Sequence, residues 1–413
     1  MATGCMTAAN AKVRLAKLAA IGVLALGAVA VWADDARAQS TISSTGQLEQ
    51  ACETSPGNVV GVGSDVKINS GVANSGAFAP AYEQVATGCT IRLAGGAKFE
   101  TDGVAMSFGG PFVVEGAGKG SAVFVKSAWK APSMSFALPG ADSEFRTDTS
   151  RLEATSGNID VATGPEADLQ FQYMSGVVYA LKAAGDVNIS GGDKTFFNVF
   201  QTSLSATGKL NVEMRGRDAT LKLAGRPNLG GGAGVGIDLG GGAPTLSAED
   251  AALSSFSGSV GISSPAQKAL VELKSSRLFG RGDTTVSLPG SEAAIKSSLS
   301  RFQSEVGRVD LLAGGPGSTV GTVELSGSDV YSATGTSIQG SPAGEKGTVK
   351  VVGGSTVRGG SGDVLIRTGT AGTTEVKDTA IWSSTVIRIL TGAGGTCVAQ
   401  NNSYISPARQ ICQ

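Results

Sequence analysis

Val323-Glu324-Leu325-Ser326-Gly327 is one copy of a pattern, an apolar-polar-apolar triplet followed by Gly or Ser, that returns about every 25 residues along this chain. In a strand, the two apolar side chains of a triplet point to one side and the polar one to the other. Self-similarity at such a period indicates a solenoid. The other copies are Val66-Lys67-Ile68, Ile91-Arg92-Leu93, Met134-Ser135-Phe136, Ile159-Asp160-Val161, Val187-Asn188-Ile189, Val212-Glu213-Met214, Ile237-Asp238-Leu239, Val271-Glu272-Leu273 and Val349-Lys350-Val351.

A second strand face repeats with a similar period. Val364-Leu365-Ile366-Arg367-Thr368-Gly369 returns 23 residues later as Ile387-Arg388-Ile389-Leu390-Thr391-Gly392. A unit of this size suits two or three short strands joined by corners, where Gly supplies the positive φ that a corner needs. Weaker copies at Phe112-Val113-Val114, Ile295, Val376 and Val398 bring the total to roughly 14 coils. The predicted fold class is all-β, a single-stranded parallel β-helix.

Three places depart from the regular pattern. The interval from Ile237 to Val271 is 34 residues and predicts a loop excursion. Between 291 and 306, apolar residues at helical spacing indicate either a short lateral helix or a coil with a poor strand at Ile295. The glycine-rich run 229–234 lies between two good triplets, so it is interpreted as a wide corner within one domain.

The N-terminal residues have the layout of a secretory signal peptide. Lys12, Arg14 and Lys17 precede an apolar run, 18–32, and Ala36-Arg37-Ala38 offers a small-x-small cleavage site. We therefore expect a signal peptide over 1–38, with an uncleaved anchor as the alternative. An N-terminal cap over 39–58, with a short helix around 48–52, a β-helix over 59–396 and a C-terminal disulfide cap over 397–413 complete the predicted organisation.

Four cysteines remain after processing, and they lie near the two ends of the chain: Cys52, Cys89, Cys397 and Cys412. An even number in a secreted chain favours disulfides, for which three connectivities are possible. Because a solenoid must cover its exposed ends, we favour Cys52 with Cys89 and Cys397 with Cys412. Free buried thiols are the alternative.

Composition excludes several functions. The chain has no histidine, which removes Ser-His-Asp and Cys-His nucleophilic systems. Its 33 basic and 34 acidic residues show no basic cluster, so nucleic acid is not an expected partner. Beyond the signal peptide, no apolar stretch is long enough to span a bilayer, so no integral membrane protein is expected.

The remaining chemistry is that of carboxylates: glycoside hydrolysis, or calcium-assisted lyase chemistry with an Arg or Lys base. The candidate residues are Asp142, Glu144 and Arg146, followed by Asp148, which would share one outer face of a strand. Arg151 and Glu153 lie just beyond. This face could hold a cation or flank a sugar, and it also has the composition of an ordinary solvated face. The segment 359–363 resembles part of a calcium-binding repeat, but its Asp comes one place early, so a corner is expected there.

Aromatic residues supply 5% of the chain, few for a sugar-binding groove. Those that fall on the repeat are expected in the core: Phe112, Phe136, Phe196, Phe279 and Tyr331. The remaining candidates for a sugar platform are Trp129, Tyr173 and Trp382.

With these features, residues 59–396 resemble the secreted right-handed parallel β-helix proteins of Gram-negative bacteria, which include adhesin passengers and pectin-lyase-like enzymes. The resemblance rests on repeat texture, and it implies a right-handed helix. It also implies an exported attachment protein of the adhesin or holdfast type, with surface glycans or envelope proteins as partners; we expect it at the cell surface, associated with the outer membrane, or outside the cell, in preference to the periplasm. End-to-end self-association is expected if a cap opens, because an exposed strand edge pairs with another strand.

The alternative that the resemblance implies is a polysaccharide lyase or hydrolase using Asp142, Glu144 and Arg146. No cofactor is expected, and calcium is the one candidate. The outward residues of the triplets change from coil to coil, which favours a scaffold.

Overall fold

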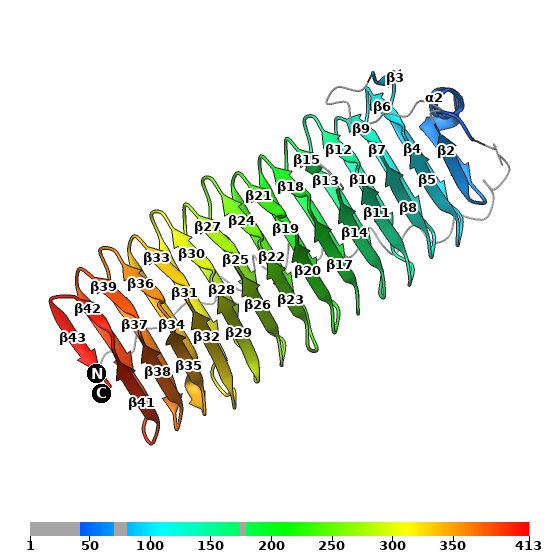
Figure 1. The fold of residues 1–413 in the computed structure, drawn as a ribbon. Coiled ribbons are helices and arrows are strands. Elements are labelled where there is room, and N and C mark those ends of the chain that lie inside the picture. Colours follow the sequence, from blue (N-terminus) through cyan, green and yellow to red (C-terminus); the bar gives the residue numbers. More distant parts are fainter. Residues whose placement is uncertain (1–41, 70–80, 174–178, 413) are drawn as a thin grey trace, which may run out of the picture. The chain divides into compact units, whose positions relative to one another are not determined.

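A computed structural model describes residues 42–69, 81–173 and 179–412 of the chain, and the predicted signal peptide lies outside these residues. From Thr41 onward the chain forms one compact unit. It winds through three parallel sheets in turn, which makes a parallel β-solenoid of about 13 turns (Figure 1). The predicted fold class is therefore confirmed, with a coil number close to the predicted one.

Each sheet takes every third strand of the chain, and neighbouring strands in a sheet belong to successive coils. Sheet A contains β1 (Val59–Val62), β4 (Cys89–Leu93), β7 (Phe112–Gly116), β10 (Met134–Leu138), β13 (Ile159–Thr163), β16 (Val187–Gly191), β19 (Lys209–Met214), β22 (Gly234–Leu239), β25 (Val260–Ser263), β28 (Thr284–Leu288), β31 (Arg308–Ala313), β34 (Gly335–Glu345), β37 (Val364–Thr370), β40 (Val386–Leu390) and β43 (Ala408–Ile411).

Sheets B and C follow sheet A in each coil. Sheet B contains β2 (Val66–Asn69), β5 (Lys98–Asp102), β8 (Ser121–Val125), β11 (Glu144–Asp148), β14 (Asp168–Gln172), β17 (Phe196–Phe200), β20 (Thr220–Ala224), β23 (Thr245–Glu249), β26 (Leu270–Lys274), β29 (Ala293–Ser298), β32 (Gly321–Ser326), β35 (Thr348–Val352), β38 (Thr373–Lys377) and β41 (Thr396–Gln400). Sheet C contains β3 (Glu83–Val85), β6 (Ala105–Phe108), β9 (Ala128–Ala131), β12 (Arg151–Ala154), β15 (Tyr179–Ala183), β18 (Ser203–Ala206), β21 (Asn228–Gly231), β24 (Ala252–Ser255), β27 (Arg277–Gly280), β30 (Arg301–Ser304), β33 (Asp329–Ser332), β36 (Thr356–Gly359), β39 (Ala380–Ser383) and β42 (Ser403–Ile405).

The triplets that predict the fold belong to two different sheets. Those between 91 and 239 lie in sheet A, whereas the one at 66–68 and those from 271 onward lie in sheet B. The long interval from Ile237 to Val271 is therefore a change of sheet, and the predicted loop excursion is wrong. The sheet A strand in this interval, β25, has Gly261 between Val260 and Ile262, and so lacks the polar centre of a triplet.

Between 291 and 306 the second interpretation is the correct one. Residues 293–298 and 301–304 form β29 and β30, which pair with the coils on either side. Ile295 and Phe302 are buried in these strands, whereas Leu299 is 69% exposed at the corner between them. The helical spacing arises by chance, because two of the apolar residues lie on successive strands and Leu299 lies at the exposed corner between them.

Glycine is not the main source of positive φ at the corners. Many corner residues between sheets B and C adopt left-handed conformations with other side chains, such as Thr149 at 52° and Asp250 at 53°. Glycine is instead needed where successive coils approach closely: a Cβ on Gly232 would lie 2.0 Å from the carbonyl oxygen of Thr207. In the run 229–234, only Gly232 and Ala233 lie between the strands β21 and β22, so the corner is narrow rather than wide.

A ladder of buried hydroxyls follows the corner between sheets B and C. The backbone N–H of Ser276 donates to Oγ of Ser300 (3.1 Å), and that of Ser328 donates to Oγ of Ser355 (3.1 Å). These serines are almost fully buried. The hydroxyls thus satisfy backbone groups that the turn takes out of the sheets, as buried polar groups require.

The two ends of the solenoid are built differently. At the N-terminal end, helix α2 (Thr45–Thr54) begins after Ser44, whose side chain accepts a hydrogen bond from the N–H of Gln47 (3.3 Å), and it is followed by the short 3-10 helix η1 (Pro56–Asn58). At the C-terminal end, residues 396–411 form a last coil paired to the three sheets, rather than a separate cap. Both predicted disulfides, Cys52–Cys89 and Cys397–Cys412, are confirmed.

Candidate functional site

Two of the three candidate residues from the sequence lie on β11, on the outside of sheet B, and the third lies at the corner before this strand. Glu144 and Arg146 face outward, as predicted, and Asp142 lies at the preceding corner with φ of 56°. Arg146 donates to Asp148 (3.1 Å), and Asp142 is 3.9 Å from Nζ of Lys119 on the adjacent coil. The arginine and the corner aspartate are thus engaged in ion pairs within and between coils.

Neither candidate calcium position gathers a set of ligands. The residues that the structure describes contain no group of three or more His, Cys, Asp or Glu side chains placed to share a metal ion. In the segment 359–363, Asp363 instead accepts hydrogen bonds from Arg388 (2.7 Å) and Thr385 (2.6 Å) of the next coil. The corner interpretation of this segment is consistent with these contacts.

A charged cluster lies on the outside of sheet C around the carboxylate of Glu153. This carboxylate faces Arg151 on its own strand, Lys130 of the preceding coil (4.0 Å) and Lys182 of the following one (3.5 Å). Nζ of Lys130 also lies 4.6 Å from the ring centre of Tyr82. Burial raises the pKa of Tyr82, so its phenol stays protonated at neutral pH and cannot serve as a base there.

The cluster therefore joins three coils through one acid and leaves a surplus of positive charge. The sequence singled out Arg151 and Glu153, but the other members come from different coils. Lys130, Lys182 and Tyr82 come close to Glu153 only through the register of successive coils, so their spacing in the sequence does not predict the cluster.

The prediction for aromatic residues is right for some positions and wrong for others. Phe112 and Phe136 are buried, as expected, whereas Phe196, Phe279 and Tyr331 face outward. Among the three proposed platforms, Trp129 and Tyr173 are buried, and Trp382 is 36% exposed. Phe279 and Tyr331 are outward because they alternate with the buried positions of short strands, which are Leu278 and Gly280 in β27 and Val330 and Ser332 in β33.

Three of the outward aromatics, Phe279, Tyr331 and Trp382, lie in one column on sheet C. The register of β27, β30, β33, β36, β39 and β42 places the following residues side by side in successive coils: Phe279, Gln303, Tyr331, Arg358, Trp382 and Ile405. The parallel column beside it contains Arg277, Arg301, Asp329, Thr356 and Ala380. We refer to Arg277, Phe279, Arg301, Tyr331, Arg358 and Trp382 as the arginine-aromatic face.

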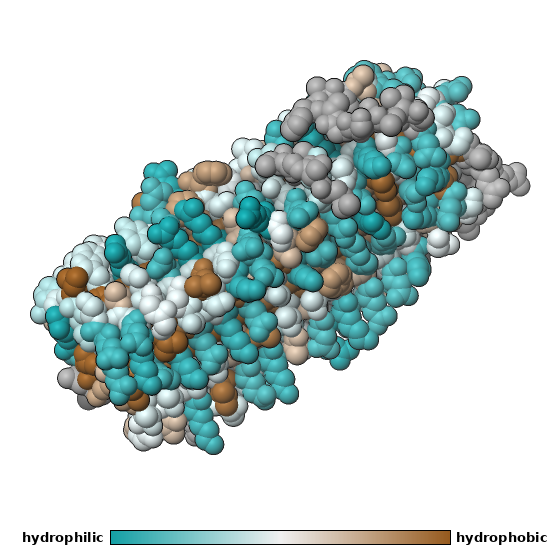
Figure 2. All heavy atoms as spheres, in the orientation of Figure 1, coloured by the Kyte–Doolittle hydropathy of each residue, from teal (hydrophilic) through white to brown (hydrophobic). Residues whose placement is uncertain are grey.

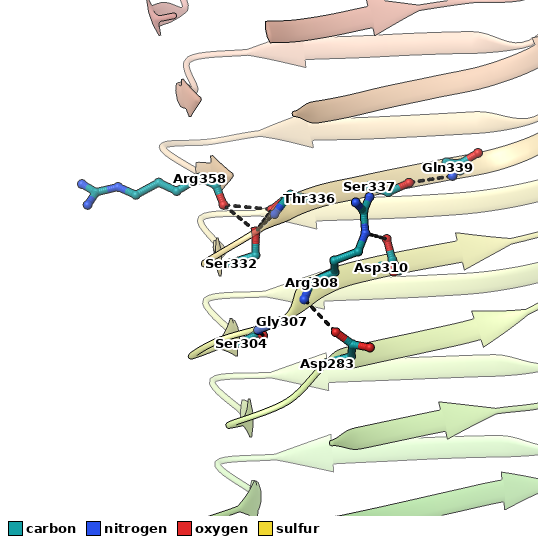
Figure 3. A network of polar contacts seen from close by, with 11 residues as sticks. Asp283, Ser304, Gly307, Arg308, Asp310, Ser332, Thr336, Ser337, Gln339 and Arg358 are labelled. Carbon is teal, nitrogen blue, oxygen red and sulfur yellow. Dashed lines mark hydrogen bonds and ion pairs between the residues drawn. The ribbon is translucent and has the colours of Figure 1, made fainter. Parts of the chain in front are cut away.

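The backbone beneath this face is held from inside the solenoid. The carbonyl oxygen of Arg358 accepts hydrogen bonds from the hydroxyls of Thr336 (2.8 Å) and Ser332 (3.3 Å), while the guanidinium points away from this network (Figure 3). Arg277 lies over the ring of Phe279 at 4.9 Å. Figure 2 shows hydrophobic residues interspersed among hydrophilic ones on the visible surface, as such mixed columns require.

On sheet B the outward charges are paired. Acidic and basic residues alternate along successive coils in the central column of its outer face, which is more regular than the sequence suggested. This column contains Glu272, Lys296, Glu324, Lys350 and Glu375. Every Lys and Arg on the strands of sheet B except Lys222 has an acidic partner in the same sheet: the pairs are Lys67–Glu100, Lys98–Glu100, Arg146–Asp148, Lys274–Glu249, Lys296–Glu272, Lys350–Glu324 and Lys377–Glu375.

Comparison with models of known protein families, with curated proteins and with solved structures finds no match to this chain. In the part of the chain that the structure describes, no helix has both the length and the hydropathy needed to cross a membrane.

Proposed function

We propose that this chain is an exported attachment scaffold, a cell-surface or extracellular-matrix structural protein of the adhesin or holdfast type. The observation that carries the proposal is the unbroken stacking of the coils, since each sheet continues from the first coil to the last. Such a stack keeps outward side chains in straight columns at every turn. This geometry suits weak contacts that repeat along a surface and add up by multivalency.

Two further observations support export. The solenoid is closed near each end by a disulfide, and disulfides of this structural kind form in oxidising compartments outside the cytosol. The sequence also predicts a signal peptide over 1–38. Together they favour a location on the cell surface or in the matrix.

A deletion of one coil tests the scaffold directly. Val235 and Val260 occupy equivalent positions in β22 and β25, so removing residues 235–259 joins Gly234 to Val260 in the native register. We expect cells producing this shortened protein to display it and to attach as the parent does, while cells lacking the gene attach poorly. Protease shaving of intact cells measures the display.

The matched control removes residues 235–247, which is half a coil and sets strands of one sheet against those of another. This variant should fail to fold and should not restore attachment. Normal attachment of cells that lack the gene, or protein that shaving cannot release, would contradict the proposal.

The rival proposal, a lyase or hydrolase, is tested on the candidate residues of β11. A triple variant, Asp142→Asn with Glu144→Gln and Arg146→Gln, is compared with the parent for depolymerisation of acidic glycans. Activity that is present in the parent and lost in the triple variant would overturn the scaffold in favour of an enzyme.

A further inference from the structure

We infer that the arginine-aromatic face of sheet C binds an acidic polysaccharide whose repeat is a disaccharide with a single carboxylate. The inference rests on the proposed attachment function and names the ligand class and the residues that hold it. It follows from the charge of this face, from the exposure of its rings and from the spacing of both along the solenoid.

The charge of the face is positive and unpaired. From β27 to β39 the strands of sheet C carry three arginines and one acid, Asp329. Among the described residues, no acid lies within ion-pair distance of Arg301 or Arg358, and both side chains are exposed. A guanidinium group matches a carboxylate with two parallel hydrogen bonds, so these arginines suit an anionic ligand of that geometry.

Two rings of the face are open for stacking, and a third is covered by an arginine. Tyr331 and Trp382 are 37% and 36% exposed, whereas Phe279 is partly exposed and the guanidinium of Arg277 lies over its ring at 4.9 Å, so a sugar that stacks there displaces this guanidinium. An aromatic face offers an apolar, rigid platform to the apolar side of a sugar ring. Two buried hydroxyls hold the backbone carbonyl of Arg358, whose strand lies between those of Tyr331 and Trp382, so the backbone beneath the face is fixed.

The spacing of the rings selects a two-sugar repeat. Phe279, Tyr331 and Trp382 occupy every second coil of their column, which corresponds to roughly 9.6 Å between neighbouring rings, since strands are about 4.8 Å apart. In an extended β-linked chain, successive sugar rings turn alternate faces, so every second ring presents the same face to a flat surface. A disaccharide of such a chain is of about this length.

The residues between the rings determine the charge expected for the second sugar of the repeat. Gln303 and Arg358 occupy the intervening coils of the same column. With Asp329 offsetting one arginine, the face has about one net positive charge for two coils. A polymer with one carboxylate in each disaccharide matches this density. A polymer with an anion on every unit, such as a homopolyuronate or single-stranded DNA, would bring surplus charge onto Asp329.

The test uses the full mature chain and a hyaluronan dodecasaccharide, in which uronate and neutral sugars alternate. Titration calorimetry of the parent, Trp382→Ala and Arg358→Gln gives the affinities. We expect each variant to bind roughly tenfold more weakly, the loss of one good contact among several. Added salt should weaken the parent more than Arg358→Gln, because the variant has lost a charged contact.

The matched controls remove an outward ring and an outward cation from sheet B. Phe200→Ala removes an outward ring that is 39% exposed, and Lys222→Gln removes a cation outside the ion pairs of that sheet. Both should bind as the parent does. Equal losses in these controls, or no binding by the parent, would overturn the inference.

Three further ligands check the class. A neutral chitin oligosaccharide, an oligogalacturonate and single-stranded oligo-dT are titrated under the same conditions. Any of the three binding as tightly as hyaluronan, with the same sensitivity to Trp382→Ala and Arg358→Gln, would overturn the proposed ligand class. If the attachment of cells depends on the protein but hyaluronan does not bind, the ligand inference fails and the proposed attachment function stands. If hyaluronan binds through this face but attachment does not depend on the protein, the proposed attachment function fails and the ligand inference stands.

Discussion

The N-terminal half of the solenoid buries many aromatic side chains, whereas the C-terminal half buries few. In the N-terminal half, aromatic rings fill the interior and touch one another through successive coils: they are Phe99, Phe108, Phe112, Phe124, Trp129, Phe136, Phe145, Phe171 and Phe197. Among the described residues beyond 200, Phe302 is the one fully buried ring, and the other large rings lie on the surface or near it. The same fold is thus filled in two ways.

The C-terminal half fills its interior mainly with aliphatic side chains. Its inward positions are mostly Val, Leu and Ile, and the serine ladder beside them satisfies the turns between sheets B and C. The aromatics of this half therefore contribute little to the interior, and their place on sheet C calls for an explanation outside folding. This difference is the physical reason for separating structural aromatics from binding ones.

The largest expected effect comes from two tryptophans on the same sheet. Trp129 is fully buried and lies 4.6 Å from the ring of Phe112, whereas Trp382 is on the outer face. We expect Trp129→Ala to lower the free energy of unfolding by about 3–5 kcal/mol, because it leaves a cavity among packed rings. Trp382→Ala should change it by less than about 0.5 kcal/mol. Urea unfolding of both variants measures the difference.

A third variant separates ring loss from loss of the polar group. The indole N–H of Trp129 is buried and has no hydrogen-bond partner among the described residues. Trp129→Phe keeps a ring and removes this donor, so it should cost clearly less than Trp129→Ala. Equal destabilisation by Trp129→Ala and Trp382→Ala would remove the distinction between the two halves.

The sequence predicts the fold because the core positions of a solenoid repeat with the coil. Triplets such as Val323-Glu324-Leu325 report alternation and period together, and the position of the cysteines near the two ends made the disulfide pairing predictable. The failures arise where the repeat changes its frame. Gly261 interrupts the triplet in one strand of sheet A, so the visible pattern moves to sheet B, and the resulting 34-residue interval resembles a loop excursion.

The candidate binding face was not predictable in the same way. The strands that carry Tyr331 and Trp382 are short and lack the clear triplet pattern, so the sequence does not show which of their residues face inward. Their alignment with Arg358 depends on register across coils of unequal length. The Glu153 cluster has the same origin, because its cations come from three coils.

A smaller effect is expected from the hydroxyl ladder at the corner between sheets B and C, which runs through both halves. Oγ of Ser276 accepts from the N–H of Ala251 (3.2 Å) and donates to the carbonyl of Lys274 (2.9 Å). Ser276→Ala leaves that buried N–H without its partner and should cost about 1–3 kcal/mol in urea unfolding. Ser247→Ala, on the outer face of sheet B, is the control and should be nearly neutral. A neutral Ser276→Ala would show that the ladder does not contribute to the stability of the solenoid.

The smallest effects come from two outward acids whose pKa values move in opposite directions in the two halves. Hydrogen bonds from Lys67 and Lys98 lower the pKa of Glu100, so its contribution to stability is full above the ordinary carboxyl pKa and is lost as pH falls through the lowered value. Burial raises the pKa of Asp310, so stability declines as pH rises from the ordinary value through the raised one.

Glu100→Gln should flatten the acid side of the stability profile, and Asp310→Asn should slightly stabilise the protein at neutral pH. Each change should stay under about 1 kcal/mol, because both groups are partly exposed. Urea midpoints from about pH 3 to 7 measure both slopes, and the same slope for the two variants would contradict the opposite signs.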